Sequence, residues 1–400
     1  MLHYLKFTTF PLIAIGVMHA MMQGGAWMYT GILALVFVVA LGDILLPDDR
    51  SEPRMEGEFF LNLMLWLTLP ILMWVTLCFT WGVAPVDVLG IDGFMKSTFG
   101  YDRLQLQADT TWYQWFVGAV AGAFLFGAGG TNVGHELTHR TYSMRDMILG
   151  RWMLAFTCDA SFAIEHVYGH HKNLGTPADP ATAQRGENVY SFVLKSTIGG
   201  YKSAWKLEKQ RLAKFNQSVW NPIHSRMMRG NLMSLGLFAA SFYIGGWAGV
   251  VMFWVMSAGG KTLLEIVNFM EHYGIVRRPE DKVEPRHSWN TNASVSTALL
   301  YALTRHSHHH AEADQEYWNL RSYQHAPMLP TGYLGTILLA LVPPLYKKVM
   351  TPLLNHWDET FATPEEKKLA IEASVKSGMK GLKSAQLGQQ ASQNMNRAAA

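Results

Sequence analysis

The 400-residue chain contains little cysteine and little charge. Its two cysteines, Cys78 and Cys158, are far apart and form no CxxC pair, which excludes a disulfide framework and an iron–sulfur or rubredoxin-type centre within the chain. We expect both to be ordinary buried thiols. Charged residues make up 16% of the sequence, against about 25% in soluble proteins. The net charge of +3 is too small for the dense basic patch of a nucleic-acid-binding protein, so no nucleic-acid partner is expected.

The chain contains several long runs without charged residues. Residues 7–42 contain no Asp, Glu, Lys or Arg. One helix of that length would measure about 54 Å, against a hydrocarbon core of roughly 30 Å, so the run must turn back on itself, and Gln23-Gly24-Gly25 is the predicted turn. Further uncharged runs cover 59–86, 110–134 and 230–260, the last with a predicted turn at Gly245-Gly246. The sequence therefore predicts an all-α polytopic membrane protein with about six transmembrane helices and a cytoplasmic, histidine-rich cap for two metals.

The runs divide the chain into regions of different character. With a cytoplasmic N-terminus, the loops after the fourth and sixth spans are cytoplasmic, as is the polar tail, and the Lys/Arg-rich stretch 139–229 agrees with the positive-inside tendency. Residues 326–346 are uncharged but broken by prolines, which predicts an interfacial or re-entrant segment. The polar tail, residues 365–400, is predicted to form a surface helix followed by a flexible end. The predicted regions are 1–134 (spans one to four), 135–229 (first and second histidine clusters), 230–272 (spans five and six), 273–364 (last histidine cluster and interfacial segment) and 365–400 (polar tail).

Histidines gather at the predicted ends of the spans. The chain has 16, and nine fall in four clusters, three of which place histidines three or four residues apart, on one face of a helix. Packing does not explain such a pattern, so we expect a metal site. The candidate ligands are His135, His139, His166, His170, His171, His272, His306, His309 and His310. Outside the clusters, we expect His19 to be packed or hydrogen-bonded, His308 to point away from the metals, His325 to be exposed or to support a ligand, and the rest to lie on the surface: His3, His224, His287 and His356.

The stretch GHELTHR, residues 134–140, contains the HExxH pattern of zinc peptidases. A peptidase zinc site uses three protein ligands and keeps one position open, whereas nine histidines suit two metals with four or five imidazoles each. Imidazole binds iron, zinc, copper and nickel, so the ligand type does not name the metal. A zinc metalloprotease is therefore a weak alternative. A metal transporter is another, disfavoured because its polar residues belong at the bilayer midplane rather than at helix ends.

Carboxylates accompany the histidine clusters. A ligating histidine usually donates its second N–H to a carboxylate or carbonyl, which orients the ring, and salt bridges or helix-end charges are the alternative role for each acid. The acids considered for this role are Glu136, Asp159, Glu165, Glu271 and Asp314.

Four motifs resemble those of the integral-membrane alkane monooxygenases, the alkane ω-hydroxylase family. That family's pattern is HELxHK, EHxxGHH, LQRHSDHHA and NYxEHYG. This chain has HELTHR, EHVYGHH, LTRHSHHHA and VNFMEHYG, and the stretch GTPADPATAQRGENVYSF after the second motif is also family-like. The departures are Arg140, Thr304, His308 and Phe269, none of which removes a candidate ligand.

The resemblance implies a non-haem site with two iron ions held by the nine histidines, with no catalytic side chain beyond the metals. It implies O₂-dependent terminal hydroxylation of medium-chain n-alkanes to 1-alkanols in the bacterial inner membrane, with electrons from rubredoxin and a rubredoxin reductase upstream. Xylene-type monooxygenases and membrane fatty-acid desaturases and hydroxylases share similar motifs and are the alternatives. An alkane offers only apolar surface, so we expect an apolar channel from the bilayer, with Trp66, Trp74, Trp112 and Trp115 as candidates for its wall.

Overall fold

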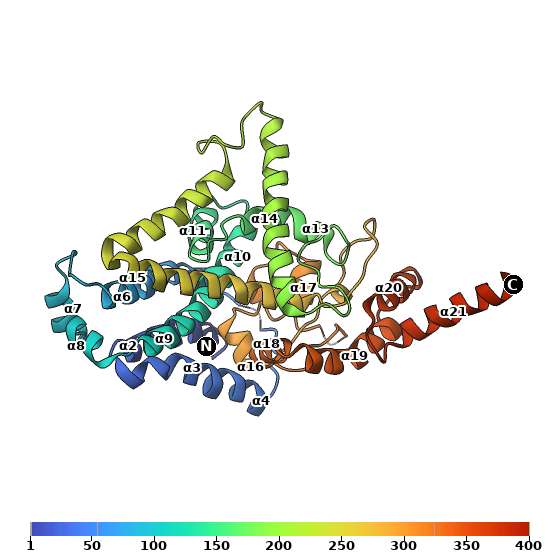
Figure 1. Cartoon of the computed structure of the whole chain (residues 1–400), viewed down its shortest axis with the longest axis horizontal. Helices are drawn as coiled ribbons and strands as arrows, with labels where there is room; N and C mark the ends of the chain where they lie inside the picture. The colour runs from blue at the N-terminus through green and yellow to red at the C-terminus, as the bar shows by residue number, and fades with distance from the viewer. Residues whose placement is uncertain (1, 54, 324, 400) are drawn as a thin grey trace.

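The computed structural model describes residues 2–53, 55–323 and 325–399. In these residues the regular structure consists of helices, and a single isolated bridge pairs Asn290 with Met328. The all-α prediction is confirmed. Most long helices run in roughly the same direction on one side of the molecule, and shorter helices gather at one end of them (Figure 1).

The first two membrane-length helices form a hairpin. Helix α2 (Thr9–Met21) leads to a turn, after which α3 (Thr30–Ala34) continues through a π-helical segment into α4 (Leu41–Leu45). Gly24 and Gly25 have φ angles of 76° and 54°, a region in which side chains other than glycine are strained. A Cβ atom on Gly24 would also lie 2.8 Å from the hydroxyl oxygen of Thr110. The turn predicted from the sequence is confirmed.

Three more helices of the described chain are long and apolar enough to cross a membrane: Glu58–Gly82, Trp112–His139 and Arg226–Glu271. The last, α15 (Arg226–Glu271), has a non-helical backbone at Gly246, with φ 57° and ψ −150°. The chain reverses there, so α15 consists of two arms, and a Cβ atom on Gly249 would lie 2.4 Å from the carbonyl oxygen of Ser241 across the turn. Five helices, one of them double, agree with the prediction of about six spans.

The fourth span is built to pack closely on its neighbours. It consists of α9 (Trp112–Leu125), a π-helical segment (Phe126–Thr131) and α10 (Asn132–His139). A Cβ atom on Gly134 would lie 2.9 Å from the carbonyl oxygen of Gly150 in α11 (Met144–Ala155). Helix α11 therefore lies against α10, and this contact fixes the end of α10 that bears the first histidines.

Short helices cover the ends of α10 and α15. After α11 come α12 (Phe162–Glu165), the π-helical segment η5 (His166–His170), α13 (His171–Asn173) and the long α14 (Val189–Ala213). Later in the chain come α16 (Ser294–Leu299), α17 (His306–Ala311) and α18 (Tyr333–Ala340). Helix α18 has only eight residues and packs on the end of α15, where the Tyr333 hydroxyl donates a hydrogen bond to Glu271. It does not span, in line with the interfacial prediction.

The C-terminal region differs from the prediction of a flexible end. After α19 (Pro343–Thr360), both α20 (Pro364–Ser377) and α21 (Lys383–Ala399) are helical, and α21 extends away from the body (Figure 1). The base of α21 is anchored because Leu382 is buried and Ser384 lies 2.7 Å from Ser374.

Candidate metal centre

The four histidine clusters meet at one place in the fold. The end of α10, segment η5 with α13, the end of α15 and helix α17 bring all nine candidate histidines together in two adjacent groups. In the first group, one ring nitrogen of each histidine lies within 4.8 Å of those of the others, and the second group combines two sets that each meet the same limit and share His272: His170, His272 and His310, and Glu271, His272 and His306. The five-histidine group is His135, His139, His166, His171 and His309. The four-histidine group is His170, His272, His306 and His310, with Glu271 at its edge.

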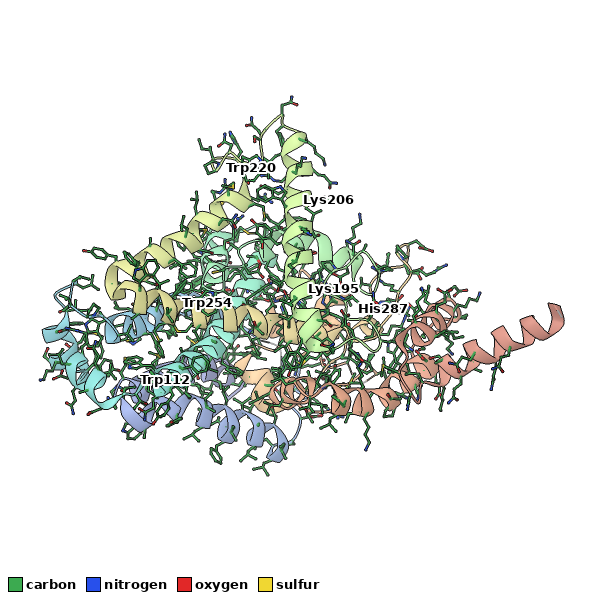
Figure 2. The ribbon with its side chains drawn as sticks, in the orientation of Figure 1. Trp112, Lys195, Lys206, Trp220, Trp254 and His287 are labelled. Atoms are coloured by element: carbon green, nitrogen blue, oxygen red, sulfur yellow. The ribbon has the colours of Figure 1, made fainter. Side chains whose placement is uncertain are left out.

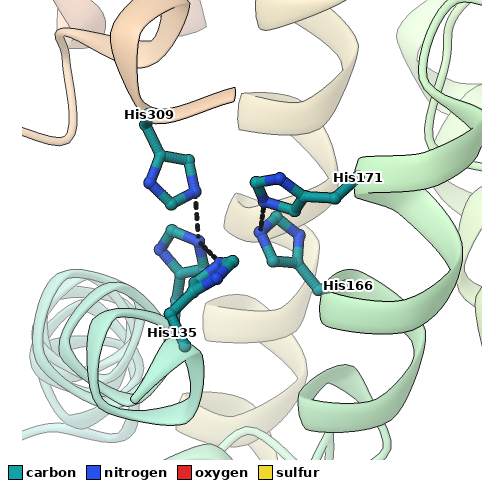
Figure 3. Close-up of side chains that lie close together, drawn as sticks. His135, His166, His171 and His309 are labelled. Atoms are coloured by element: carbon teal, nitrogen blue, oxygen red, sulfur yellow. Dashed lines mark hydrogen bonds between the residues drawn. The ribbon is translucent and has the colours of Figure 1, made fainter. Parts of the chain in front are cut away.

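Ring nitrogens in the five-histidine group point at one another (Figure 3). The Nε2 atom of His135 lies 3.0 Å from Nε2 of His309 and 3.0 Å from Nε2 of His139. The Nε2 atoms of His166 and His171 are 2.9 Å apart. Three separate segments of the chain therefore aim the same ring atom at one small volume.

The four-histidine group is arranged in the same way. The Nε2 atom of His306 lies 2.8 Å from that of His310 and 3.3 Å from that of His272. A carboxylate oxygen of Glu271 is 3.2 Å from the same His306 nitrogen. The two groups touch, because the rings of His171 and His310 have centroids 4.3 Å apart.

A π-helical turn decides how the second cluster divides. The sequence predicts that His166 and His170 share a helix face, as residues four apart do in an α-helix. Residues His166–His170 instead form a π-helix, whose wider turn brings residues five apart onto one face. A nitrogen of His166 therefore joins that of His171, while His170 contributes to the four-histidine group. The rings of His166 and His170 still stack on one face, as predicted, with centroids 5.0 Å apart.

The electrostatics of the cluster fit a bound cation. Burial, reinforced by neighbouring imidazoles, lowers the pKa values of His166, His171 and His309 well below their ordinary value, so these rings are neutral and offer lone pairs. Two facing neutral nitrogens can share at most one proton, and the buried Nε2 of His170 has no hydrogen-bond partner in the described residues. Buried polar atoms left unpaired destabilise a fold, and a cation at the centre of each group would satisfy them.

Asp179 orients a candidate ligand and was not among the acids considered from the sequence. Its Oδ2 atom lies 2.9 Å from Nδ1 of His170 and accepts a hydrogen bond from the Thr182 hydroxyl at 2.6 Å, while its Oδ1 atom accepts one from the Ala181 N–H at 3.0 Å. Although burial opposes a charged ring, Asp179 raises the pKa of His170. The residue lies in the family-like stretch GTPADPATAQRGENVYSF, which was the available signal.

Of the five acids considered, Glu271 alone has a described contact with a histidine ring of the cluster. Glu136 instead pairs with Arg140 at 2.9 Å, and Asp159 pairs with Lys261. Glu165 is buried with its Oε1 atom unpartnered, and Asp314 is exposed. For Glu136 and Asp159 the contacts therefore match the alternative role of a salt bridge, and the carboxylate of Asp314 meets solvent.

Asp159 belongs to a buried ion cluster that holds α15 against the turn before α12. Lys261 contacts both Asp159 and Glu265, the latter at 2.6 Å. We expect Lys261→Met to lower the stability to unfolding by about 3–5 kcal/mol, because two buried carboxylates lose their counter-charge. The melting temperature of the purified protein measures the effect. Lys206→Met, on the exposed side of α14, is the control and should change stability by less than about 0.5 kcal/mol. A melting temperature unaltered by Lys261→Met would contradict the role of the ion cluster.

Several residues outside the clusters also have defined places. His19 is hydrogen-bonded to the Tyr101 hydroxyl at 2.9 Å, and His308 lies outside both groups, with Nδ1 accepting from the Arg321 N–H at 2.8 Å, as predicted. The surface prediction for His287 is wrong, because its ring is fully buried and lies 2.7 Å from Glu366. The prediction of a buried thiol at Cys158 is also wrong, since the turn after α11 leaves this residue exposed with a φ of 55°.

An apolar cavity ends at the cluster. Its inner end is formed by His135, His166 and His306 together with Glu271, and its wall comes from α2, α3, α9, α15, α16 and α18. The predicted tryptophans do not line it. Trp66 donates to Asp146 at 3.1 Å, Trp74 and Trp115 pack against phenylalanine rings, and Trp112 is exposed. Smaller apolar side chains form the wall instead, among them Phe10, Ile13, Val17, Leu35, Val39, Ala121, Leu263 and Leu299.

Comparison with known proteins agrees with the motifs. The fatty acid desaturase family matches residues 110–339. Alkane 1-monooxygenase 2 of Pseudomonas aeruginosa is 33% identical over 80% of this chain and 81% of that protein. Alkane 1-monooxygenase 2 of Alcanivorax borkumensis is 35% identical over 78% of this chain and 77% of its own. The hydroxylase component of the xylene/toluene monooxygenase of Pseudomonas putida is 30% identical over 94% of this chain and 95% of its own.

Proposed function

The chain belongs to the fatty acid desaturase family, and from its similarity to alkane 1-monooxygenases we propose that it is a membrane alkane 1-monooxygenase, which converts medium-chain n-alkanes and O₂ into 1-alkanols. The observation that carries the proposal is the apolar cavity that ends at nine converging histidines. A catalyst for unactivated C–H bonds needs both parts. The cavity selects a substrate without polar groups, and the histidines hold the metals that react with it.

Two iron ions are proposed as the metals, one in each histidine group. The five-histidine group would hold one through His135, His139, His166, His171 and His309. The other would bind to His170, His272, His306 and His310. Bound iron would supply the oxygen chemistry, in which O₂, two electrons and two protons give one oxygen atom to the substrate and one to water. The protein's own task is to aim neutral imidazole nitrogens at two points and to exclude solvent around them.

Substrate binding rests on burial alone. Each buried CH₂ group contributes about 0.8 kcal/mol, so an eight-carbon chain in the cavity gains roughly 6 kcal/mol without any hydrogen bond. The cavity wall is apolar until its inner end, where Glu271, Tyr333 and Asn268 lie near the histidines. These polar side chains are the groups that a newly formed terminal hydroxyl would meet. The terminal carbon is therefore the part of the chain placed beside the metals.

Electrons must come from a partner, because the sequence offers no redox centre of its own besides the proposed metals. We propose that rubredoxin donates them, with rubredoxin reductase upstream, as the family resemblance implies. The metal end and both termini would then face the cytoplasm of a bacterial inner membrane. The Lys/Arg-rich stretch 139–229, which adjoins the metal end of the spans, supports this orientation.

Isotope labelling tests the proposal directly. The protein is reconstituted with iron, a rubredoxin, its reductase and octane under ¹⁸O₂. Formation of 1-octanol that contains ¹⁸O is the expected result. An alkene product, or oxygen from water in the alcohol, would overturn it.

Hydroxylation of an aryl methyl group is the second candidate, because the xylene/toluene relative matches this chain over 94% of its length. The same assay with xylene in place of octane separates the two. A benzylic alcohol formed with a higher kcat/KM than 1-octanol would favour the aryl substrate.

The hydrogen bond between Asp179 and His170 gives a prediction for metal affinity. Asp179→Asn keeps the shape but loses the negative charge that fixes the ring. Loss of such a partner typically costs about 10–100-fold in metal affinity, and we expect a decrease of that size in a competition titration with an iron chelator. Asp314→Asn, on an exposed acid, is the matched control and should bind iron normally. Equal affinities in both variants would contradict the orienting role.

A further inference from the structure

Helix α14 crosses between the two ends of α15. Near its start, the ring of Phe192 packs on Phe269 at the end of the second arm, with centroids 5.4 Å apart. Near its other end, Glu208 accepts a hydrogen bond of 2.6 Å from the backbone N–H of Arg226, where the first arm begins. Because α15 reverses at Gly246, its two ends lie at the same face of the membrane. A helix that joins them must lie along that face, and Figure 1 shows α14 standing across the direction of the second arm.

The exposed surface of α14 is divided into two stripes. An apolar stripe consists of Tyr190, Leu194, Ile198 and Tyr201, which are spaced as neighbours on one helix face and are between 42% and 67% exposed. Beside it runs a basic stripe of exposed lysines: Lys195, Lys202, Lys206 and Lys209. Figure 2 shows Lys195 and Lys206 along this helix. The one acid of α14 is Glu208, which is occupied by Arg211 at 2.8 Å and by the start of α15. Just before the helix, Glu187 contacts Lys195 at 2.8 Å, so a lipid phosphate at Lys195 would compete with this ion pair.

The apolar stripe borders the part of the first arm that would meet lipid. The Tyr201 hydroxyl accepts a hydrogen bond of 3.0 Å from the Asn231 side chain, five residues after α15 begins. Leu232 and Leu235, which follow in the same arm, are exposed. The apolar surface is therefore continuous from the span to α14.

The loop between α14 and α15 adds large apolar side chains at the same boundary. Phe215, Trp220 and Ile223 are all exposed, and the ring of Trp220 lies 4.7 Å from that of Trp205 in α14 (Figure 2). Such residues on a soluble surface would favour aggregation, whereas tryptophan beside an entering span is typical of the membrane–water interface.

We propose that α14 and the loop 214–225 form an interfacial platform that binds anionic lipid. The apolar stripe and the loop side chains enter the acyl boundary, and the four lysines of the basic stripe contact lipid phosphates. The pairing of an apolar face with a lysine-rich face is the pattern of helices that lie in the membrane surface. The platform rests on the membrane location of the chain and is independent of the reaction that it catalyses.

Spin-label accessibility tests where the two stripes lie. In a Cys78→Ala, Cys158→Ser background, labels are attached after Ile198→Cys, Ile223→Cys or Lys206→Cys, and the proteins are placed in lipid nanodiscs. We expect the labels at 198 and 223 to collide mainly with O₂, which partitions into lipid. The label at 206 should collide mainly with a water-soluble nickel chelate. Labels at 198 and 223 that are both as accessible to nickel as the label at 206 would overturn the platform.

A second experiment tests whether the platform responds to the charge of the lipid headgroups. We expect phosphatidylglycerol in the nanodisc to increase the O₂ accessibility at 198 relative to pure phosphatidylcholine, and the variant K195Q/K202Q/K206Q/K209Q to abolish that increase. Four exposed lysines elsewhere, changed together as K348Q/K368Q/K376Q/K380Q, provide the control and should leave the increase intact. An unchanged lipid response in the first variant, with a raised KM for the electron-donor protein, would overturn the lipid assignment in favour of an acidic protein partner. The accessibility readout needs no turnover, so its failure is separate from failure of the proposed reaction.

Discussion

Replacing His170 with alanine should abolish alkane hydroxylation and release metal from the four-histidine group. The buried Nε2 of His170 has no protein partner in the described residues, and Asp179 holds the other side of its ring. Changes to groups that only orient a ligand already cost about 10–100-fold, so loss of a ligand should reduce product formation by more than about 100-fold. Iron content per chain and the rate of 1-alkanol formation are the two measurements. We expect the iron content to fall toward one ion per chain.

The chain offers a close control for this change. His308 lies beside His309 in α17, but its nitrogens face the Arg321 N–H at 2.8 Å and Glu312 at 3.5 Å rather than the cluster. His308→Ala should keep its iron and most of its activity. If His170→Ala also retained full iron and full activity, the assignment of the four-histidine group as a metal site would be refuted.

A larger side chain at the end of the cavity that lies away from the metals should shift the substrate preference to shorter alkanes. Val17 lines the cavity on α2, close to the turn at Gly24, whereas the metal-binding end is formed at the end of α10. Val17→Phe adds bulk where the tail of a long substrate would lie. Displacing about three methylenes, at about 0.8 kcal/mol each, predicts a loss of roughly 50-fold in kcat/KM for the longest substrates. Alkanes that are short enough to avoid the new ring should react as before.

Competition among alkanes of different length measures this effect. Ile15→Phe is the matched control, since Ile15 lies on the same helix but is exposed and does not line the cavity. It should leave the chain-length profile unchanged. A Val17→Phe enzyme with the original profile would show that the tail of the substrate lies elsewhere.

The spans and their turns could be predicted from the sequence because each depends on a local physical property. A charge-free run longer than the bilayer must turn, and Gly24 and Gly246 stand where the backbone needs conformations that other residues resist. The convergence of the nine histidines could be predicted because packing does not readily explain their spacing and number. Predicting these features requires only residues that are close together in the sequence.

Other features depend on contacts between distant segments and could not be predicted in this way. The α-helical rule placed His166 and His170 on one face, but it did not predict the π-helical turn that divides their nitrogens between the two groups. The burial of His287 depends on Glu366, 79 residues away. The cavity wall is a further example, because its smaller apolar residues come from helices that are far apart in the sequence. Of the tryptophans proposed for the wall, Trp66 contacts Asp146 and Trp112 is exposed.

The five-residue turn of η5 limits how this motif can vary. Its width places His166 and His171 on one metal-facing side, while the residues between them include Val167 and Tyr168, which are not buried. Because neither side chain is buried, we expect substitutions at these two positions to leave the ring directions intact. The π-turn already holds one residue more than an α-helical turn, so a further one-residue insertion would turn every later histidine of the segment by about 100°, the step of an α-helix, away from its group. Variant libraries for this region should therefore keep its length fixed and change only the residue types.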